Sequence, residues 1–256
     1  MLTIIMCIEY NGTDYHGWQI QSDRKTIQGE LNNALYKIFA KEYNAVGAGR
    51  TDTGVHSSGQ IAHFTLDEEP NIPRHKLRLA INQKLPLSIR VKRLWFSSLE
   101  FHSRFDASLR EYRYRFSRHP SVFDQRHVAF FPYQLDIDLL LQSAELFIGR
   151  HNFFTFSKSN STNSDYICTI EKCFWTRKEN NIFELCVIAD RFVYGMVRAI
   201  VGAMQDVARG KKTKNSIKEA LATQNRLLAS SLAPANGLDL HRIYYSAPFD
   251  CIWCEK

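Results

Sequence analysis

The sequence of 256 residues has no long apolar run and no basic leader. Its longest apolar stretch, near residues 139–149, is interrupted by polar residues well short of the roughly 20 that cross a bilayer. The first residues, "MLTIIMCIEYNG", alternate like a strand and lack the basic start and small-residue cleavage site of a signal peptide. We therefore expect a cytoplasmic protein with no membrane partner.

Cysteine is also sparse, with six residues that fall mostly inside apolar segments. A reducing compartment leaves such cysteines as small buried hydrophobes, so we expect no disulfides. Cys251 and Cys254 have CxxC spacing, but no second CxxC or paired histidines complete a zinc site. No carboxylate or cysteine completes a set with His56 or His63 either, so both are interpreted as scaffold or RNA-contact positions and no metal site is predicted.

The glycine-rich residues 47–60, "GAGRTDTGVHSSGQ", lack the signature of a nucleotide-binding loop. They have no Lys-Ser/Thr pair, and they do not match the glycine pattern of dinucleotide sites. One interpretation is a tight turn, in which Gly47, Gly49 and Gly54 allow positive φ and Asp52 bonds its own backbone.

The tripeptide "DTG" at residues 52–54 also occurs in aspartic proteases, whose chemistry needs two carboxylates that share a proton. The chain has no second DTG or DSG. Arg50 argues further against this class, because a nearby cation favours an ionised carboxylate and the protease must hold one acid protonated. A lone ionised Asp52 suits a different role, as a nucleophile or as a proton acceptor.

The formal net charge is +7, and arginines alternate with aromatic residues between positions 104 and 118. Cations beside rings suit the phosphates and bases of RNA. The same alternation fits a half-buried strand with a charged face, and the sequence alone leaves both interpretations open. The interleaved residues are Arg104, Phe105, Arg110, Tyr112, Arg113, Tyr114, Arg115, Phe116 and Arg118.

Apolar periodicity predicts helices and strands mixed along the chain, with Thr26 and Asp136 as helix N-caps and Asn180–Asn181 as a hairpin turn. Hairpin-like neighbours favour an α+β fold with mainly antiparallel strands, divided into residues 1–107 and 108–256. Helices are expected at 26–41, 73–84, 136–148, 192–209 and 214–223. Strands are expected at 2–9, 60–66, 89–98, 109–118, 166–178, 182–190 and 238–245.

The run "AGRTDTGVHSSGQIAHF" resembles the signature of the tRNA pseudouridine synthase A family: AGRTD, a small residue, GVHA, then a glycine, a glutamine and an apolar strand. Six further elements resemble that family in the same order and extend the resemblance over nearly the whole chain. They are "YNGTDYHGWQIQ" with "TIQGEL", "AINQKLP", "FHSRFDASLREYRYRF", "GRHNFFTF", "FVYGMVRAIVGAM" and "LAPANGLDLHRIYY".

The resemblance implies a pseudouridine synthase fold: two similar α/β halves around an extended, mainly antiparallel sheet, with the active site in the cleft between them. It implies an isomerase that converts uridine to pseudouridine at positions 38 to 40 of the tRNA anticodon arm without a cofactor or a metal. It also implies a homodimer that grips one tRNA across both subunits. The competing class is an RNA-binding module that has kept the fold without the chemistry.

The resemblance also assigns roles to four residues. Asp52 matches the catalytic aspartate, and Arg50 matches the arginine that helps to hold the target nucleotide out of the RNA stack. Tyr112 matches the tyrosine that stacks on the uracil, and Arg198 matches the arginine that pairs with the aspartate. Helical spacing also places Arg198 outside the apolar stripe of its helix, where Gly202 leaves room for another chain segment.

This sequence departs from the family's pattern at three points. Ser103 stands in the HAR element, Asn152 in the HDF element, and Val193 and Tyr194 in the FLH element. None of these positions is one of the four with an assigned role.

Overall fold

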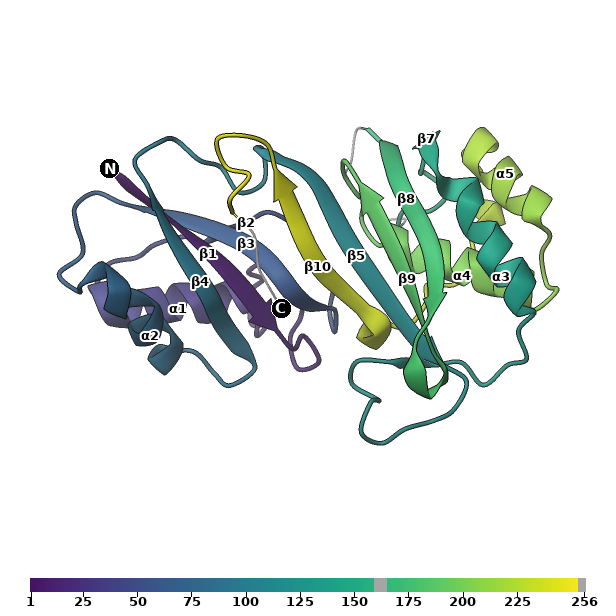
Figure 1. Ribbon diagram of the computed structural model, residues 1–256, viewed down its shortest axis with the longest axis horizontal. Helices are drawn as coiled ribbons and strands as arrows, with labels where there is room; N and C mark the ends of the chain where they lie inside the picture. The colour runs from purple at the N-terminus through teal and green to yellow at the C-terminus, as the bar shows by residue number, and fades with distance from the viewer. Residues whose placement is uncertain (159–164, 253–256) are drawn as a thin grey trace. The chain divides into compact units, whose positions relative to one another are not determined.

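The structure is a computed structural model that describes residues 1–158 and 165–252. Its chain divides into two compact units (Figure 1). The first unit comprises Met1–Arg110 together with the chain from Asp239 onward, and the second comprises Glu111–Leu238. The division expected from the sequence placed everything after residue 107 in the second half. The structure instead groups the last strand, which pairs with β3 through Asp239 and Leu240, with the first unit.

The sheet of the first unit has the strand order β4-β1-β3-β10, and the short strand β2 also pairs with β3. β1 pairs antiparallel with both β3 and β4, whereas β10 runs parallel to β3. The elements are β1 (Leu2–Tyr10), α1 (Ile27–Phe39), β2 (Val46–Gly47), β3 (His56–Leu66), α2 (Arg74–Lys84), β4 (Ile89–Ser97) and β10 (Leu238–Tyr245).

The two helices of the first unit pack their apolar stripes into one core with β1, β3 and β4. α1 begins at the predicted place because the Thr26 side chain accepts a hydrogen bond from Gly29 N. Its residues Ile27, Leu31 and Leu35 are fully buried, and Leu77 and Ile81 of α2 join them. β3, which follows the glycine-rich loop of Asp52, therefore packs on an apolar core.

The sheet of the second unit has the order β5-β9-β8-β7, with the short strand β6 parallel to the end of β5. β7, β8 and β9 pair antiparallel, and Asn180 and Asn181 form the predicted turn, both with φ of 56°. The elements are β5 (Ala107–Ser117), β6 (Ala129–Phe130), α3 (Ile137–Ala144), β7 (Gly149–Asn152), β8 (Ile167–Arg177), β9 (Ile182–Ala189), α4 (Met196–Ala208) and α5 (Lys214–Thr223). β5 begins in the first unit, at Ala107.

The predicted helices and strands are confirmed, with small differences at their ends. α3 begins after Asp136, whose side chain accepts from Leu139 N as expected of an N-cap. α4 starts at Met196 rather than at residue 192, because Gly195 before it has a left-handed φ of 76°. β2, β6 and β7 were not predicted, since runs of two to four residues are too short to show alternation.

One cysteine differs from expectation. Cys168, Cys173, Cys186 and Cys251 are free thiols. Cys7, fully buried in β1, is disulfide-bonded, so the prediction of no disulfides is wrong at this position. That prediction rested on the expected compartment and not on geometry. Cys254 of the CxxC pair lies outside the described residues.

Within the described part of the chain, no helix is both long enough and apolar enough to cross a membrane.

Candidate active site

Asp52 lies in the loop that connects β2 to β3, and the entrance of this loop is tied to β3 by its backbone. Ala48 N donates to Ile61 O over 2.8 Å. The fully buried Gln60 side chain accepts from Gly49 N at 3.2 Å and donates to Gly49 O at 2.7 Å. The side-chain amide of Gln60 thus satisfies both backbone groups of Gly49, a role that no local sequence pattern predicts.

Both sides of Asp52 are also held by the segment that follows β1. Trp18 N donates to Thr51 O over 3.1 Å, and Gly54 N donates to Tyr15 O over 3.2 Å. The Tyr10 and Thr51 hydroxyls lie 2.9 Å apart. Asp52 itself is half-buried. The fold therefore fixes the backbone around this carboxylate, as a reacting group requires.

Two glycines of that segment allow it to approach the loop closely. A Cβ atom on Gly12 would lie 1.9 Å from Val55 O, and one on Gly17 would lie 2.5 Å from Thr51 O. In the loop itself only Gly54 has a positive φ, of 78°, while Gly47 packs against the Trp18 ring. Positive φ at Gly47 and Gly49 is therefore not what the loop requires.

Replacing Gly12 by alanine is expected to destabilise the protein by about 1–3 kcal/mol, because the added methyl group collides with backbone that cannot move freely. Urea unfolding at pH 7 measures the change. The matched control is Gly29→Ala in α1, where a Cβ meets only the Thr26 side chain at 3.0 Å and Ile20 at 3.9 Å. The control should be destabilised less, since a side chain can shift where backbone cannot and alanine favours a helix. Equal stabilities of both variants would contradict the close approach.

Arg50 is exposed on the same loop, two residues before Asp52. An exposed arginine on the loop of a half-buried carboxylate can reach an anionic polymer without first breaking the packing of the core. This arrangement suits extrusion of a nucleotide, which costs a few kcal/mol and is favoured by a group that fills the vacated space.

Tyr112 lies on β5 and belongs to the second unit. Its ring is 8% exposed and packs edge-on against Phe192, with centroids 4.9 Å apart. Tyr114 and Phe116 are fully buried on the same face of the strand, as the alternation predicted. Burial raises the pKa of Tyr114 well above its usual value, although Arg198 partly opposes this, and its hydroxyl donates to Pro234 O over 3.0 Å.

The opposite face of β5 carries an ion-pair network. Arg115 Nε lies 2.6 Å from Glu184 Oε2, and Arg113 Nε lies 2.9 Å from Glu111 Oε1. Burial raises the pKa of Glu184, but Arg115, Lys178 and Arg113 outweigh it and lower that pKa below its usual value. Buried acids from β5 and β9 pair with Arg113 and Arg115, which favours the other interpretation of these two arginines, a half-buried strand with a charged face.

Arg198 lies in the first turn of α4, also in the second unit. Its Nε donates to Ala233 O over 2.7 Å, and Ala233 N donates back to Arg198 O over 3.1 Å. A Cβ atom on Gly202 would lie 2.0 Å from Ser231 O, which confirms that Gly202 admits another chain segment. This segment, residues 230–234, holds Arg198 in place. Of the four predicted residues, Arg50 and Asp52 thus share one loop of the first unit, and Tyr112 and Arg198 belong to the second.

His63 of β3, which the sequence suggests as a scaffold or RNA-contact position, supports the start of the loop through Ser103. Its Nδ1 accepts from Ser103 N over 3.1 Å, while Ser103 Oγ donates to Val46 O of β2 over 2.6 Å. Burial is the main effect that lowers the pKa of His63 to about 4. Neighbouring His102 also lowers this pKa, and Asp106 partly opposes both effects by raising it. The imidazole is therefore neutral at physiological pH, as an accepting Nδ1 requires.

Lowering the pH is expected to reduce the free energy of unfolding, because protonation of His63 is disfavoured in the folded state. The folded-state pKa of about 4 lies below the ordinary 6.5, so the unfolded chain binds the extra proton between these values and stability falls as pH drops through them. Between pH 7 and pH 5 the loss should be about 2 kcal/mol. Urea unfolding at the two pH values measures it. His63→Asn should lack this part of the loss, and an unchanged pH dependence in that variant would contradict the assignment.

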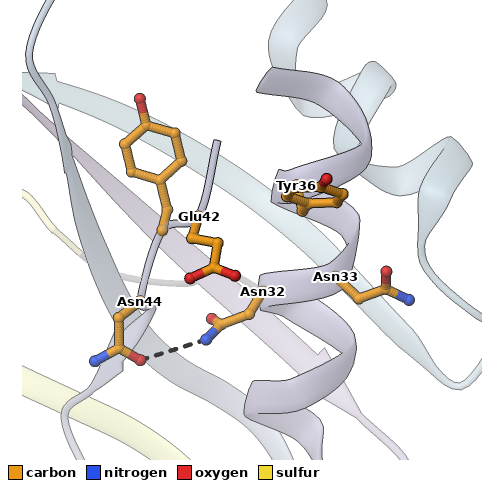
Figure 2. Close-up of a pocket in the computed structure, with 6 residues that line it drawn as sticks. Asn32, Asn33, Tyr36, Glu42 and Asn44 are labelled. Atoms are coloured by element: carbon orange, nitrogen blue, oxygen red, sulfur yellow. Dashed lines mark hydrogen bonds between the residues drawn. The ribbon is translucent and has the colours of Figure 1, made fainter. Parts of the chain in front are cut away.

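A hollow of about 600 Å³ lies beside α1. Its lining carries several side-chain amides, and Figure 2 shows Asn32 hydrogen-bonded to Asn44 across it, at 3.4 Å. None of the four predicted site residues lines it, so we do not take it as the active site. It is lined by Asn32, Asn33, Tyr36, Glu42, Tyr43 and Asn44. Among residues 1–158 and 165–252, no group of three or more His, Cys, Asp or Glu side chains is placed to hold a metal ion.

Comparison with known proteins assigns the family. Residues 6–106 and 143–246 match the model of a family described as tRNA pseudouridine synthase. The chain therefore belongs to the tRNA pseudouridine synthase family. The predicted α+β fold class is confirmed, and so is the prediction that the chain is an isomerase of this family.

Three relatives called tRNA pseudouridine synthase A match over nearly their whole length. The one from Fervidobacterium nodosum is 36% identical over 96% of this chain and 100% of its own. The one from Caldicellulosiruptor saccharolyticus is 37% identical, also over 96% and 100%. The one from Brevibacillus brevis is 35% identical over 93% of this chain and 97% of its own.

Proposed function

We propose that this chain isomerises uridine to pseudouridine at positions 38 to 40 of the tRNA anticodon stem-loop, with Asp52 as its catalytic residue. The observation that carries the proposal is the loop of Asp52. It has the family's signature, its backbone is held by β3 and by residues 15–18, and its carboxylate is half-buried. The family match to 6–106 and 143–246 includes this loop and Arg198.

The reaction breaks the bond between uracil N1 and ribose C1′ and forms one between C5 and C1′. The hydrogen on C5 leaves to water as a proton, and N1 takes up a proton, so the base is an isomer and nothing is oxidised. Asp52 acts as an ionised carboxylate, by adding to the sugar or the base or by accepting a ribose proton. Each of these routes benefits from a site that excludes bulk water.

Three further residues are proposed to complete the site. Arg50, exposed beside Asp52, takes the place of the extruded nucleotide in the RNA stack. Tyr112 supports the uracil with its ring. Arg198, fixed through Ala233, stabilises the charged form of the aspartate. The proposal needs neither a cofactor nor a metal.

Tritium release tests the proposed activity. tRNA transcripts labelled with tritium at uracil C5 are incubated with the protein, and release into water reports C5 substitution. Transcripts that keep uridine at only one of positions 38, 39 and 40 show which positions react. Tight, salt-sensitive tRNA binding with no release from any transcript would instead establish the competing function, an RNA-binding module.

The resemblance also supports a homodimer that works in the cytoplasm and grips one tRNA across both subunits. The chain has a mass of 29.7 kDa. Sedimentation equilibrium should therefore give about twice that value, and the mass of a single chain at micromolar concentration would exclude a stable dimer.

A further inference from the structure

The turn before β5 displays an aromatic ring that the proposed function does not use. Phe105 is 75% exposed, although it is a large apolar residue. Its ring stacks on His102, with centroids 4.2 Å apart and planes inclined by 27°. The Arg104 guanidinium lies 5.7 Å from the ring centroid. We call residues 102–105 the Phe105 platform.

Hydrogen bonds make this platform rigid. His102 Nδ1 accepts from Arg104 N at 3.3 Å and from Phe105 N at 3.2 Å. His102 N donates to Asp106 Oδ2 over 2.7 Å, and Asp106 N returns a bond to His102 O over 3.0 Å. The ring is thus presented by a turn that is already ordered, so that a partner binds it at little entropic cost.

The platform is fastened to the strands from which the catalytic loop emerges. Ser103 Oγ donates to Val46 O of β2 over 2.6 Å, and Tyr245 Oη donates to Ser103 O over 2.7 Å. Val46 precedes Arg50 by four residues, a span of at most about 14 Å even when fully extended. Phe105 therefore stands in the same unit as Asp52, with its turn anchored close to the start of the loop.

The surroundings of Phe105 favour a nucleobase as its partner. A protein interface buries a ring among other apolar side chains, whereas the Phe105 ring contacts His102 and the Arg104 guanidinium. Proteins that bind single-stranded nucleic acid combine exposed rings with cations that follow the phosphates. In the segment 104–118, where arginines alternate with aromatic residues, Tyr112, Tyr114 and Phe116 are buried, but Phe105 and Arg104 are exposed.

We propose that Phe105 is a stacking platform for an unpaired base of the RNA, near the target uridine, and that Arg104 binds an adjacent phosphate. This inference rests on the proposed function, since it takes the RNA to be the substrate tRNA. It adds a second base-binding site, in which the ring fixes the RNA register and takes no part in the chemistry.

A series of variants at position 105 tests the stacking. Phe105→Ala is expected to weaken tRNA binding by about 5- to 100-fold, and to raise KM by a similar factor with kcat unchanged. Phe105→Trp should bind at least as well as the parent, and Phe105→Leu should resemble alanine because it keeps the apolar bulk but lacks a π-face. The control is Phe123→Ala, which removes a phenylalanine that is 93% exposed in the second unit. Full rescue by leucine would overturn the proposal.

Abasic substitutions in the tRNA identify the base. At one position near the target, loss of the base should weaken binding to the parent protein by the same factor as the Phe105→Ala substitution does. Loss of the same base should not weaken tRNA binding to the Phe105→Ala variant any further. Additive losses at every position would overturn the stacking. A changed mass of Phe105→Ala in sedimentation, with its tRNA affinity unaltered, would assign the ring to contact with a second copy and also overturn it. Ring-dependent tRNA binding without tritium release would support the stacking while it contradicts the proposed function.

Discussion

Replacing Asp52 by asparagine is expected to reduce tritium release from tRNA by about 10³-fold or more, with tRNA affinity changed only slightly. Asparagine has nearly the shape of aspartate but neither its charge nor its ability to add to carbon or accept a proton. The loop should keep its conformation, because Trp18 N and Gly54 N hold it through backbone bonds that do not involve this side chain.

The control for this variant is Asp138→Asn, which makes the same chemical change at an exposed position of α3. It should release tritium at the parent rate. Filter binding with the same transcripts reports affinity, and thermal melting reports folding. If Asp52→Asn and the parent protein release tritium equally, Asp52 is not the catalytic residue. If release and affinity fall together, the side chain contributes to binding and its catalytic role is not supported.

The helices were predictable because each combines a long apolar stripe with a local stop or start. The Thr26 and Asp136 caps act within three residues, and Gly210 ends α4 with a φ of 71°. Strand pairing was not predictable in the same way. β10 joins β3 through Asp239 and His56, which are far apart in the sequence, so no local pattern assigns β10 to the first unit.

The arginine-rich strip shows the limit of alternation as a guide to function. The alternation of side chains along a strand correctly predicted that Tyr112, Tyr114 and Phe116 lie on one face of β5. It did not show that Glu184, on β9, pairs with Arg115 on the other face. An acid from another strand that pairs with an arginine leaves it less available to RNA, and such pairing depends on register. Phe105 and Arg104 remain exposed because they precede β5 and lie in a turn at the surface.

The same reasoning applies to the candidate site. Asp52, Arg50, Tyr112 and Arg198 were found through motifs, and the structure shows how the first two are positioned by one loop. Gln60 and Tyr10 were missed, although each supports that loop, and His63 was expected only as a scaffold or RNA-contact position, without its partners. Their roles arise from contacts with residues 11 to 41 positions away, and their residue types alone carry no such signal.

Replacing Arg198 by methionine is expected to reduce kcat by about 10²- to 10³-fold, with tRNA affinity nearly intact. Methionine keeps an unbranched chain in α4 but removes the charge proposed to stabilise the catalytic carboxylate. The variant also loses the Nε bond to Ala233 O, so a loss of about 1–3 kcal/mol in stability should accompany the effect on rate. Single-turnover kinetics with saturating enzyme, together with thermal melting, separates these contributions.

Two variants show whether the charge or the packing matters at Arg198. Arg198→Lys keeps the charge without the planar fork, so it should recover part of the rate. Arg209→Met makes the same substitution at the other end of α4, where the guanidinium lies over Tyr133 at 3.5 Å, and it should affect stability but not the rate of the folded enzyme. A loss confined to tRNA affinity in Arg198→Met would make Arg198 a phosphate contact. If the loss of rate in Arg198→Met equals the fraction of that variant that is unfolded, the role of Arg198 is purely structural, through its bond to Ala233.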